Sequence, residues 1–251
     1  MKIDMICRYP VKGLSPDTLQ TVEVEAGKAL PDDRRFALAH GASPIDPTHP
    51  TWQKKAFFLQ LMSNAKLAKL ETSYESETQT LTILRNGRRV AGGVMTEPTG
   101  RAMVEQFFGA YMESEVRGSP KLVELADGTF SDVDVAWVSL INLASVRDVE
   151  RVVGRSIDPM RFRGNLMIDG ALPWAEMDWV GKKVKIGTAI LEGMDPIGRC
   201  AATNVDPKTG ERDMTIPRDL MRGFNHSDCG LYLKIVQSGT ISEGDALELV
   251  G

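Results

Sequence analysis

Short stretches in which apolar and polar residues alternate recur along the chain. Alternation places every second side chain on one face, which is typical of half-buried β-strands. Asn86-Gly87 separates two such stretches and is a strong hairpin signal. Strands are predicted over residues 3–8, 19–25, 36–39, 65–74, 80–84, 88–91, 133–141, 183–191, 201–205, 230–236 and 239–249.

Apolar residues at helical spacing occur in only a few segments. Residues 96–111 begin with a capping threonine and a proline near the first turn, which predicts a helix. Residues 143–153 are amphipathic and end before Gly154, where glycine favours the left-handed conformation. Residues 217–223 indicate a third, short helix. The pattern as a whole predicts a mainly β (α+β) chain with a few short helices.

Composition agrees with a chain of many short strands and turns. Of its 251 residues, 23 are glycine and 13 proline, while 42% are hydrophobic and 25% charged, as in ordinary globular proteins. This length suits one large domain or two of ordinary size. Because composition shifts around Arg117-Gly-Ser-Pro120, we expect two domains, residues 1–118 and 119–251.

Charge and cysteine content exclude several classes of protein. The 30 basic and 34 acidic residues give a net charge of −4, which provides no overall attraction to nucleic acid or anionic lipid. Three scattered cysteines without a Cys-x-x-Cys motif indicate a reducing compartment. There is no signal-peptide core, no apolar window of membrane-spanning length and no common nucleotide-binding glycine loop. We therefore expect a cytoplasmic protein that binds neither nucleic acid nor membranes.

Cys200 is the strongest candidate for chemistry. It lies between the strands predicted over 183–191 and 201–205, and the following Asp206-Pro207 with Gly210 predicts a tight turn. The adjacent Arg199 can stabilise a thiolate, which is the form that binds metals and attacks electrophiles. A free cysteine can equally be a small buried hydrophobic residue. The residues alone leave metal ligand, nucleophile and core residue open.

Two other segments carry arginines that could bind an anion. Arg161 and Arg163 flank Phe162 and would share one face of an extended strand, where paired guanidinium groups suit a phosphate. The alternative is a pair of solvated arginines at a strand edge. Arg34 belongs to the charged run Asp32-Asp33-Arg34-Arg35. This run could be a solvated turn in which the acidic and basic side chains pair with one another, or Arg34 could point into a site.

Several segments occur together in an order that resembles the MOSC family, in the form with an N-terminal β-barrel domain. That form includes the amidoxime-reducing components and the C-terminal domain of molybdenum cofactor sulfurase. The segments are Tyr9-Pro-Val-Lys-Gly13, Asp33-Arg34, Phe162-Arg-Gly-Asn165, Gly198-Arg-Cys200, Val205-Asp-Pro-Lys-Thr-Gly210 and Gly239-Thr-Ile-Ser-Glu-Gly-Asp245.

The resemblance implies a β-barrel MOSC core packed closely against an N-terminal β-rich domain, and a molybdopterin cofactor. Cys200 falls on the cysteine whose thiolate binds molybdenum in the family, so it would be both the metal ligand and the catalytic residue. Gly13 and Gly198 stand where animal relatives carry serine. Positions that hold the pterin and its phosphate in the family are matched by Lys12, Gly13, Arg34, Arg163, Asn165, Gly198 and Arg199.

The implied function is reduction of small N-hydroxylated or N-oxide compounds, with electrons supplied by a separate donor protein. One alternative is a non-catalytic carrier of molybdenum cofactor, or of sulfur as a persulfide on Cys200. Another is a decayed cofactor site in which Cys200 is only a core residue. The loop 41–50, which contains three prolines and no periodicity, is predicted to gate the site.

Overall fold

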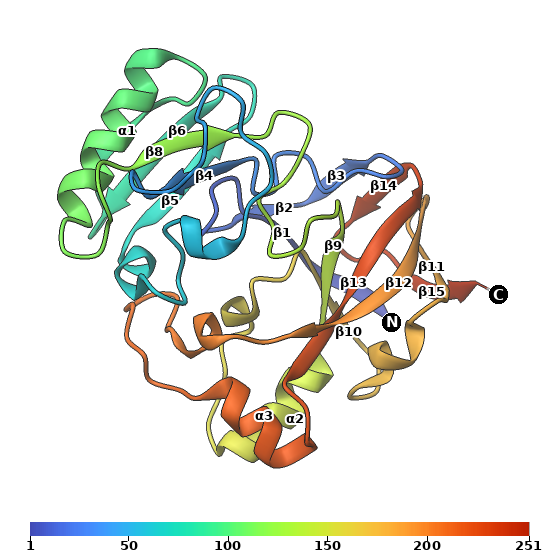
Figure 1. Ribbon diagram of the computed structural model, residues 1–251. Helices are drawn as coiled ribbons and strands as arrows, with labels where there is room; N and C mark the ends of the chain where they lie inside the picture. The colour runs from blue at the N-terminus through green and yellow to red at the C-terminus, as the bar shows by residue number, and fades with distance from the viewer. Residues whose placement is uncertain (251) are drawn as a thin grey trace.

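Strands from the second half of the chain and the first strands of the chain form one curled sheet (Figure 1). The structure is a computed structural model that describes residues 1–250. The sheet contains β1 (Lys2–Arg8), β2 (Asp17–Leu19), β9 (Val138–Asn142), β10 (Leu166–Asp169), β11 (Lys183–Ile186), β12 (Ala189–Gly198), β13 (Asp228–Gln237) and β15 (Leu247–Val250). Their order across the sheet is β15-β11-β12-β13-β9-β10-β1-β2.

The sheet curls back on itself. The amide of Ile3 donates to the carbonyl of Asp245 at 2.9 Å, and the amide of Leu247 donates to the carbonyl of Met1 at 3.0 Å. These bonds link β1 to the start of β15, which lies at the opposite edge of the sheet. Buried apolar side chains such as Ile168, Leu191 and Leu231 fill the interior. The predicted mainly β fold with a barrel-like core is therefore confirmed.

The remaining strands belong to small sheets. They are β3 (Thr21–Val24) with β14 (Gly239–Ser242), β4 (Phe36–Ala39) with β8 (Lys121–Glu124), and a sheet of β5 (Glu71–Glu75), β6 (Thr80–Arg85) and β7 (Arg88–Val94). Helix α1 (Pro98–Tyr111; Figure 1) packs beside β7 and contributes Val104 and Phe108 to a second core. Asn86 and Gly87 join β6 to β7, as predicted.

Four elements lie across the predicted domain boundary between residues 118 and 119. β1 and β2 belong to the curled sheet of the second half, β3 pairs with β14 of the second half, and β8 pairs with β4 of the first half. The boundary itself falls in the loop between α1 and β8 and remains a prediction. Because strands pair across it, the two parts are joined by main-chain hydrogen bonds as well as by the loop.

Helices α2 (Leu143–Val153) and α3 (Ile216–Phe224) pack together below the curled sheet in Figure 1. The Asn142 side chain caps α2 by accepting a bond of 3.0 Å from the amide of Ala144, and Gly154 ends the helix at φ 80°. This helix and its end match the prediction. No helix within residues 1–250 is long and apolar enough to cross a membrane.

Several predicted strands are wrong in whole or in part. Only residues 138–141 of the strand predicted over 133–141 belong to β9, and residues 239–249 contain β14 and the first part of β15, separated by a turn. Residues 183–191 form a hairpin, because Gly187 at φ 55° reverses the chain between β11 and β12. Residues 65–69 and 201–204 are 3-10 helices, since short apolar runs do not distinguish buried strand from helix. The 3-10 helices are η1 (Lys55–Phe57), η2 (Ala65–Lys69), η3 (Pro159–Phe162), η4 (Ala175–Trp179) and η5 (Ala201–Asn204).

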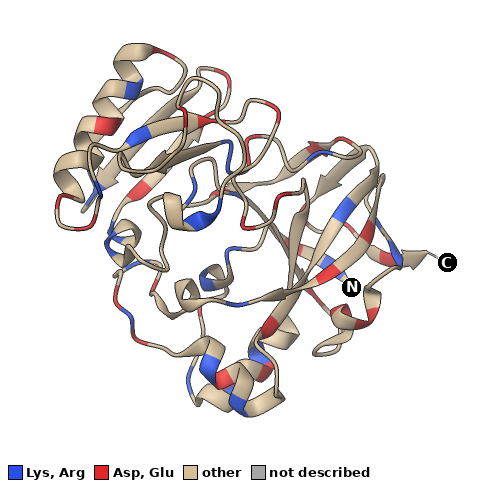
Figure 2. Cartoon of the chain, in the orientation of Figure 1, with Lys and Arg blue, Asp and Glu red and all other residues tan. Residues whose placement is uncertain are grey.

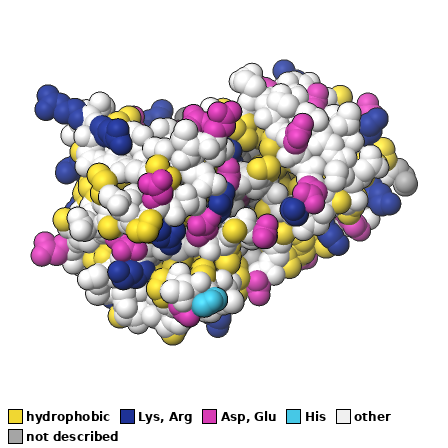
Figure 3. Space-filling view, turned by 90° about the horizontal axis from the view of Figure 1, so that it is seen from above, with side chains coloured by type: hydrophobic (Ala, Val, Ile, Leu, Met, Phe, Trp, Pro, Cys, Tyr) yellow, Lys and Arg dark blue, Asp and Glu magenta, His cyan; other side chains and the backbone are white. Residues whose placement is uncertain are grey.

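Basic and acidic residues are interspersed over both parts of the chain (Figure 2). Seen from above, the surface is hollowed between two lobes, with side chains of both signs near the hollow (Figure 3). Many of the basic and acidic side chains lie close together because they form ion pairs, as Asp32 does with Arg8 and Arg35. Positive charge is therefore concentrated only locally.

Candidate cofactor site

One cavity of about 430 Å³ brings together every residue predicted to form the site. The elements that supply these residues are the turn after β1, the turn before β4, the turn after η3 and the end of β12. The predicted residues in its lining are Lys12, Gly13, Arg34, Arg163, Asn165, Gly198, Arg199 and Cys200. Their proximity is a structural finding, while their roles toward a cofactor remain predictions.

Arg34 and Arg163 both lie over one aromatic ring. Their guanidinium carbons are 4.6 Å and 4.2 Å from the ring centroid of the fully buried Tyr9. Both arginines adopt the left-handed backbone conformation, with φ of 53° and 52°, which is uncommon for residues other than glycine. Asp33 pairs with Arg34 and accepts a bond of 2.8 Å from the Tyr9 amide. Arg34 thus faces the site and is not part of a solvated turn.

Arg161 does not share the position of Arg163, contrary to the extended strand predicted for this segment. The Asp158 side chain accepts a bond of 2.9 Å from the Met160 amide, and Pro159 favours a first helical turn, so η3 forms instead. The Arg161 side chain is only 2% exposed and pairs with Asp206 at 3.0 Å and Asp213 at 2.8 Å. It is already neutralised and holds the segment after Cys200.

Arg163 is the arginine that remains available to an anion. It forms no ion pair within residues 1–250, and its Nη2 atom is buried without a hydrogen-bond partner. Burial lowers the pKa of Arg163 to about 10, which still leaves it charged at neutral pH. A buried, charged donor without an acceptor is costly unless a ligand meets it.

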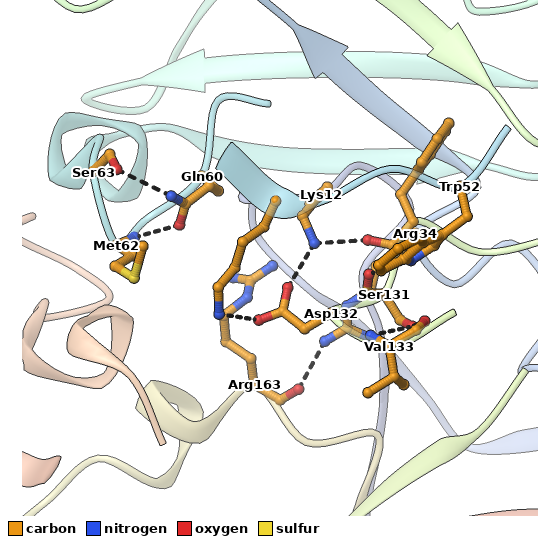
Figure 4. A network of polar contacts seen from close by, with 12 residues as sticks. Lys12, Arg34, Trp52, Gln60, Met62, Ser63, Ser131, Asp132, Val133 and Arg163 are labelled. Carbon is orange, nitrogen blue, oxygen red and sulfur yellow. Dashed lines mark hydrogen bonds and ion pairs between the residues drawn. The ribbon is translucent and has the colours of Figure 1, made fainter. Parts of the chain in front are cut away.

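Lys12 and Lys55 share the carboxylate of Asp132. Figure 4 shows the Lys12 side chain pointing toward Asp132, with a dashed line between them. The Lys12 ammonium donates to Asp132 Oδ1 and to the Phe130 carbonyl, both at 2.7 Å, and Lys55 donates to Asp132 Oδ2 at 2.8 Å. Burial disfavours the Asp132 carboxylate, but the two ammonium groups outweigh it and hold the pKa of Asp132 well below its ordinary value. Asp132 is therefore a fixed negative charge within the basic lining.

Sequence reasoning missed Lys55 and Asp132. Both lie in segments without periodicity, where a single charged residue normally indicates only solvent exposure. Burial disfavours the charged form of Lys55, but Asp132 and then Cys200 raise the pKa of Lys55 above its ordinary value. Lys55 and Cys200 line the same cavity. The aromatic residues Trp137 and Tyr232, whose ring centroids are 5.7 Å apart, also line the cavity and were not predicted.

Cys200 is half-buried at the N-terminus of η5, where its carbonyl accepts a 2.9 Å bond from the Thr203 hydroxyl. The other two thiols, Cys7 and Cys229, are buried, and burial raises the pKa of each to about 12. Cys200 is thus the one cysteine of the three that is both partly exposed and in the cavity lining. This exposure favours a chemical role over the core-residue alternative.

Arg199 and Asn165 hold the framework of the site. The Arg199 guanidinium donates to the carbonyl of Cys229, and at 2.9 Å to that of Phe162. The Asn165 amide accepts a 2.8 Å bond from the Ser139 hydroxyl and donates to the Cys7 carbonyl at 3.1 Å. Arg199 ties the end of β12 to β13 and η3, while Asn165 joins β1, β9 and β10.

The two glycines of the site differ in their surroundings. Gly13 has φ of 84°, and a Cβ atom there would lie 3.1 Å from both Gln60 Cα and the Leu59 carbonyl oxygen. A Cβ atom on Gly198 would meet only Asp228 Oδ1, at 3.5 Å. Glycine is therefore required by the backbone at Gly13 but not at Gly198.

The loop 41–50 contributes no residue to the cavity lining. The segment after it is tied to the Asp132 loop, because the Trp52 indole donates to the Ser131 carbonyl at 3.0 Å. Gating by this loop remains a prediction.

The chemistry of the lining fits an anionic, metal-bearing group. Six basic side chains face two acidic ones, Asp132 and Asp195, and neither Arg163 nor Arg199 has a carboxylate partner within the described residues. The buried, unpartnered Nη2 atom of Arg163 suits a phosphate oxygen, and the Cys200 sulfur is a soft ligand of the kind that redox metals accept. The residues present therefore fit a molybdopterin-type cofactor.

Comparison with known proteins finds a family that is similar to the second half of the chain. Residues 127–248 match the family model of the MOSC domain. The matched segment contains Asp132, Arg163, Asn165, Arg199 and Cys200.

Curated proteins are similar to parts of this chain. Mitochondrial amidoxime-reducing component 1 of Mus musculus is 29% identical over 130 residues, covering 47% of this chain and 38% of the relative. Molybdenum cofactor sulfurase of Anopheles gambiae is 26% identical over 268 residues, covering 93% of this chain and 34% of the relative. The chain thus spans little more than a third of the length of these relatives, which are associated by name with amidoxime reduction and molybdenum cofactor.

Two solved structures are similar to the chain. YuaD of Bacillus subtilis covers 99% of this chain and 94% of its own, with 10% identity and a TM-score of 0.46. YiiM of Geobacillus stearothermophilus covers 45% of this chain and 54% of its own, with 19% identity and a TM-score of 0.37.

Proposed function

We propose that this protein is a molybdenum-cofactor-binding oxidoreductase that reduces small N-hydroxylated or N-oxide compounds, with the Cys200 thiolate as a ligand of molybdenum. The observation that carries the proposal is the meeting of Cys200 with a basic lining in one cavity. The relatives named for amidoxime reduction and for molybdenum cofactor support the choice of chemistry. Electrons would come from a separate donor protein.

The basic residues would contribute to cofactor binding in different ways. Arg34 and Arg163, stacked on Tyr9, would hold the phosphate through charge-assisted bonds. Lys12, fixed by Asp132, would add a positive charge to the same lining. Gly13 and Gly198 let the backbone approach an anion closely. Arg199 fixes the end of β12 and with it the position of Cys200.

The proposed reaction breaks the N–O bond of the substrate. It consumes two electrons and two protons per N-hydroxyl group, and the oxygen leaves as water. When bound, the cofactor would supply the redox-active metal for this electron transfer. The aromatic side chains of Trp137 and Tyr232 would form part of the wall that excludes bulk water.

Molybdenum content and turnover test the proposal directly. Wild type, Cys200→Ser and the control Cys7→Ala are produced in a host that makes the cofactor. We expect near-stoichiometric molybdenum and reduction of an N-hydroxylated compound by a reduced donor in the wild type and in Cys7→Ala. Cys200→Ser should lose turnover and lose or loosen the metal. Full turnover by cofactor-loaded Cys200→Ser would refute the proposal.

The carrier alternative gives a different result in the same preparations. A persulfide carrier would release sulfur from Cys200 on treatment with cyanide and would not turn over many substrate molecules. Cyanide-releasable sulfur in the wild type, absent from Cys200→Ser and unaccompanied by reductase turnover, would replace the oxidoreductase proposal with the carrier.

A further inference from the structure

The cofactor cavity has an aromatic wall at the end that is formed by strands. β9, β13 and β12 lie side by side in the curled sheet (Figure 1). Along β13, Leu231 and Leu233 belong to the core, so Tyr232 between them points to the opposite face. Trp137 precedes the buried Val138 of β9 and packs against Tyr232, with ring centroids 5.7 Å apart. Both rings therefore lie on the face of the sheet that lines the cavity.

These two aromatic side chains are open to a ligand. Neither the Trp137 indole nor the Tyr232 hydroxyl forms a hydrogen bond within residues 1–250, and neither belongs to the polar atoms that are buried without a partner. Val133, Pro196 and Ile197 continue the wall with apolar surface. A wall of this kind, apolar with a few free polar atoms, suits the organic part of a substrate better than it suits a phosphate.

An irregularity in β12 adds Asp195 to this end of the cavity. The pairing of β12 with β13 shifts between Gly193 and Pro196, where two residues of β12 lie opposite Tyr232 alone. Such bulges redirect a side chain, and they are frequent beside active sites. Asp195 is one of these two residues, and it is exposed and lines the cavity. Asp195 therefore belongs to the aromatic end of the cavity.

The charge of Asp195 is free to meet a ligand. The acidic residues of the lining are Asp132 and Asp195. Asp132 is held by two lysines, whereas Asp195 forms no ion pair and no side-chain hydrogen bond within residues 1–250. A carboxylate beside aromatic faces favours a positive group, because such faces also attract cations. Asp195 precedes Cys200 by five residues, so at most roughly 17 Å of extended chain separates the two.

We propose that Trp137 and Tyr232 bind an aromatic part of the substrate and that Asp195 selects substrates with a positive charge at the end remote from the N–O bond. This inference rests on the proposed function and names its substrate class, which is cationic aryl N-hydroxylated compounds. The basic turns would hold the cofactor, and the strand end of the cavity would hold the substrate. The three residues determine specificity and take no part in the electron transfer.

Compounds without an N–O bond test this subsite independently of turnover. Two benzamides, one with a para methyl group and one with a para ammoniomethyl group, are titrated into the full chain and followed by saturation-transfer NMR. The ratio of their dissociation constants isolates the charge preference. Asp195→Asn, an exposed change that leaves the fold intact, should lower the preference for the cation about fivefold, as for one partly exposed charge pair. Glu192→Gln is the matched control, because Glu192 lies on β12 outside the cavity lining and should keep the wild-type ratio.

Trp137→Leu tests the aromatic part of the proposal. It should weaken the neutral benzamide about fivefold, since the ring that stacks on the ligand is lost. A wild-type ratio in Asp195→Asn, or equal affinity of wild type and Trp137→Leu for both benzamides, would overturn the proposal. Reduction of the corresponding N-hydroxybenzamidines by the cofactor-loaded protein is measured separately. Binding with the expected preferences but without turnover would support the subsite and count against the proposed function alone.

Discussion

Arg34 donates a hydrogen bond of 2.9 Å from its Nη2 atom to the backbone carbonyl of Arg163, which lies 129 residues further along the chain. Both residues are in the left-handed backbone region, a conformation that costs roughly 1–2 kcal/mol for residues with a Cβ atom. The stacking on Tyr9 and the pairing of Arg34 with Asp33 offset this cost. The two parts of the chain therefore meet at the site through a contact that fixes both arginines.

The three thiols should differ in reactivity. In the native protein one thiol per chain, that of Cys200, should react rapidly with a disulfide reagent, because it is partly exposed. Cys7 and Cys229 are buried with pKa values raised to about 12, so little thiolate is present to react. In denaturant all three should react. Colorimetric titration of native wild type and Cys200→Ser checks this, and rapid reaction of a native Cys200→Ser protein would contradict it.

Asp132→Asn should destabilise the protein at neutral pH by about 1 kcal/mol, since the buried Lys12 loses a charged partner. The Asp132 side chain is 43% exposed, which keeps the effect modest. Because its pKa is depressed in the fold, the stabilisation is present above the ordinary value of 3.8 and is lost as the pH falls below it. Urea unfolding of both proteins from pH 7 down to pH 3 measures the difference.

Asp195→Asn is the control for that comparison. Asp195 also lines the cavity, but it is exposed and forms no ion pair among the described residues. Its replacement should leave stability within about 0.5 kcal/mol of the wild type at every pH. An equal loss in the two variants would mean that Asp132 acts only through the general charge of the cavity.

Arg161→Met should lower the free energy of unfolding by about 2 kcal/mol, because Asp206 and Asp213 lose their shared partner. The same change should make the segment 204–213 more sensitive to protease in the native state. Arg151→Met provides the comparison: its pair with Asp148 has the same kind of geometry at 2.8 Å, but the arginine side chain is 70% exposed. Loss of that surface pair should cost less than about 0.5 kcal/mol.

Serine should be tolerated at one site glycine and not at the other. Gly198→Ser introduces a Cβ atom into open space, so its melting temperature should stay near that of the wild type. Gly13→Ser places a side chain at φ of 84° against the Gln60 backbone, and should cost roughly 1–2 kcal/mol. Thermal unfolding of the two variants side by side measures the contrast, and equal melting temperatures would mean that the turn at Gly13 relaxes.

Features set by neighbouring residues could be predicted from the sequence. The Asn142 cap and the Gly154 end of α2 are determined within one helix, and Asn86-Gly87 sets its hairpin by local backbone preference. The segment after Cys200 could not be assigned in this way. Its 3-10 turn depends on the hydrogen bond from the Thr203 hydroxyl to the Cys200 carbonyl. It also depends on the ion pair between Arg161 and Asp206, which are 45 residues apart in the chain.

The site was found from sequence through resemblance, because its residues are distant in the chain. Taken alone, Cys200 is compatible with a buried core residue and Arg163 with a solvated arginine at a strand edge. Only the ordered set of motifs indicates that both belong to a site. Lys55 and Asp132 carry no local signal, since their importance arises only when the fold places them 2.8 Å apart across 77 residues. The misassignment of Arg161 has the same cause: its two aspartates lie outside any local pattern.

The place of β1 between β10 and β2 has a consequence for synthesis. β1 can pair with β2 soon after both have been synthesised. Its other edge pairs with β10, which is synthesised roughly 160 residues later. At a translation rate of about 5–20 residues per second, that wait is on the order of 10 s. During it, an unpaired strand edge leaves the ribosome before its partner exists, and such edges invite association between nascent chains. The position of one strand therefore sets how long this edge stays unpaired during synthesis.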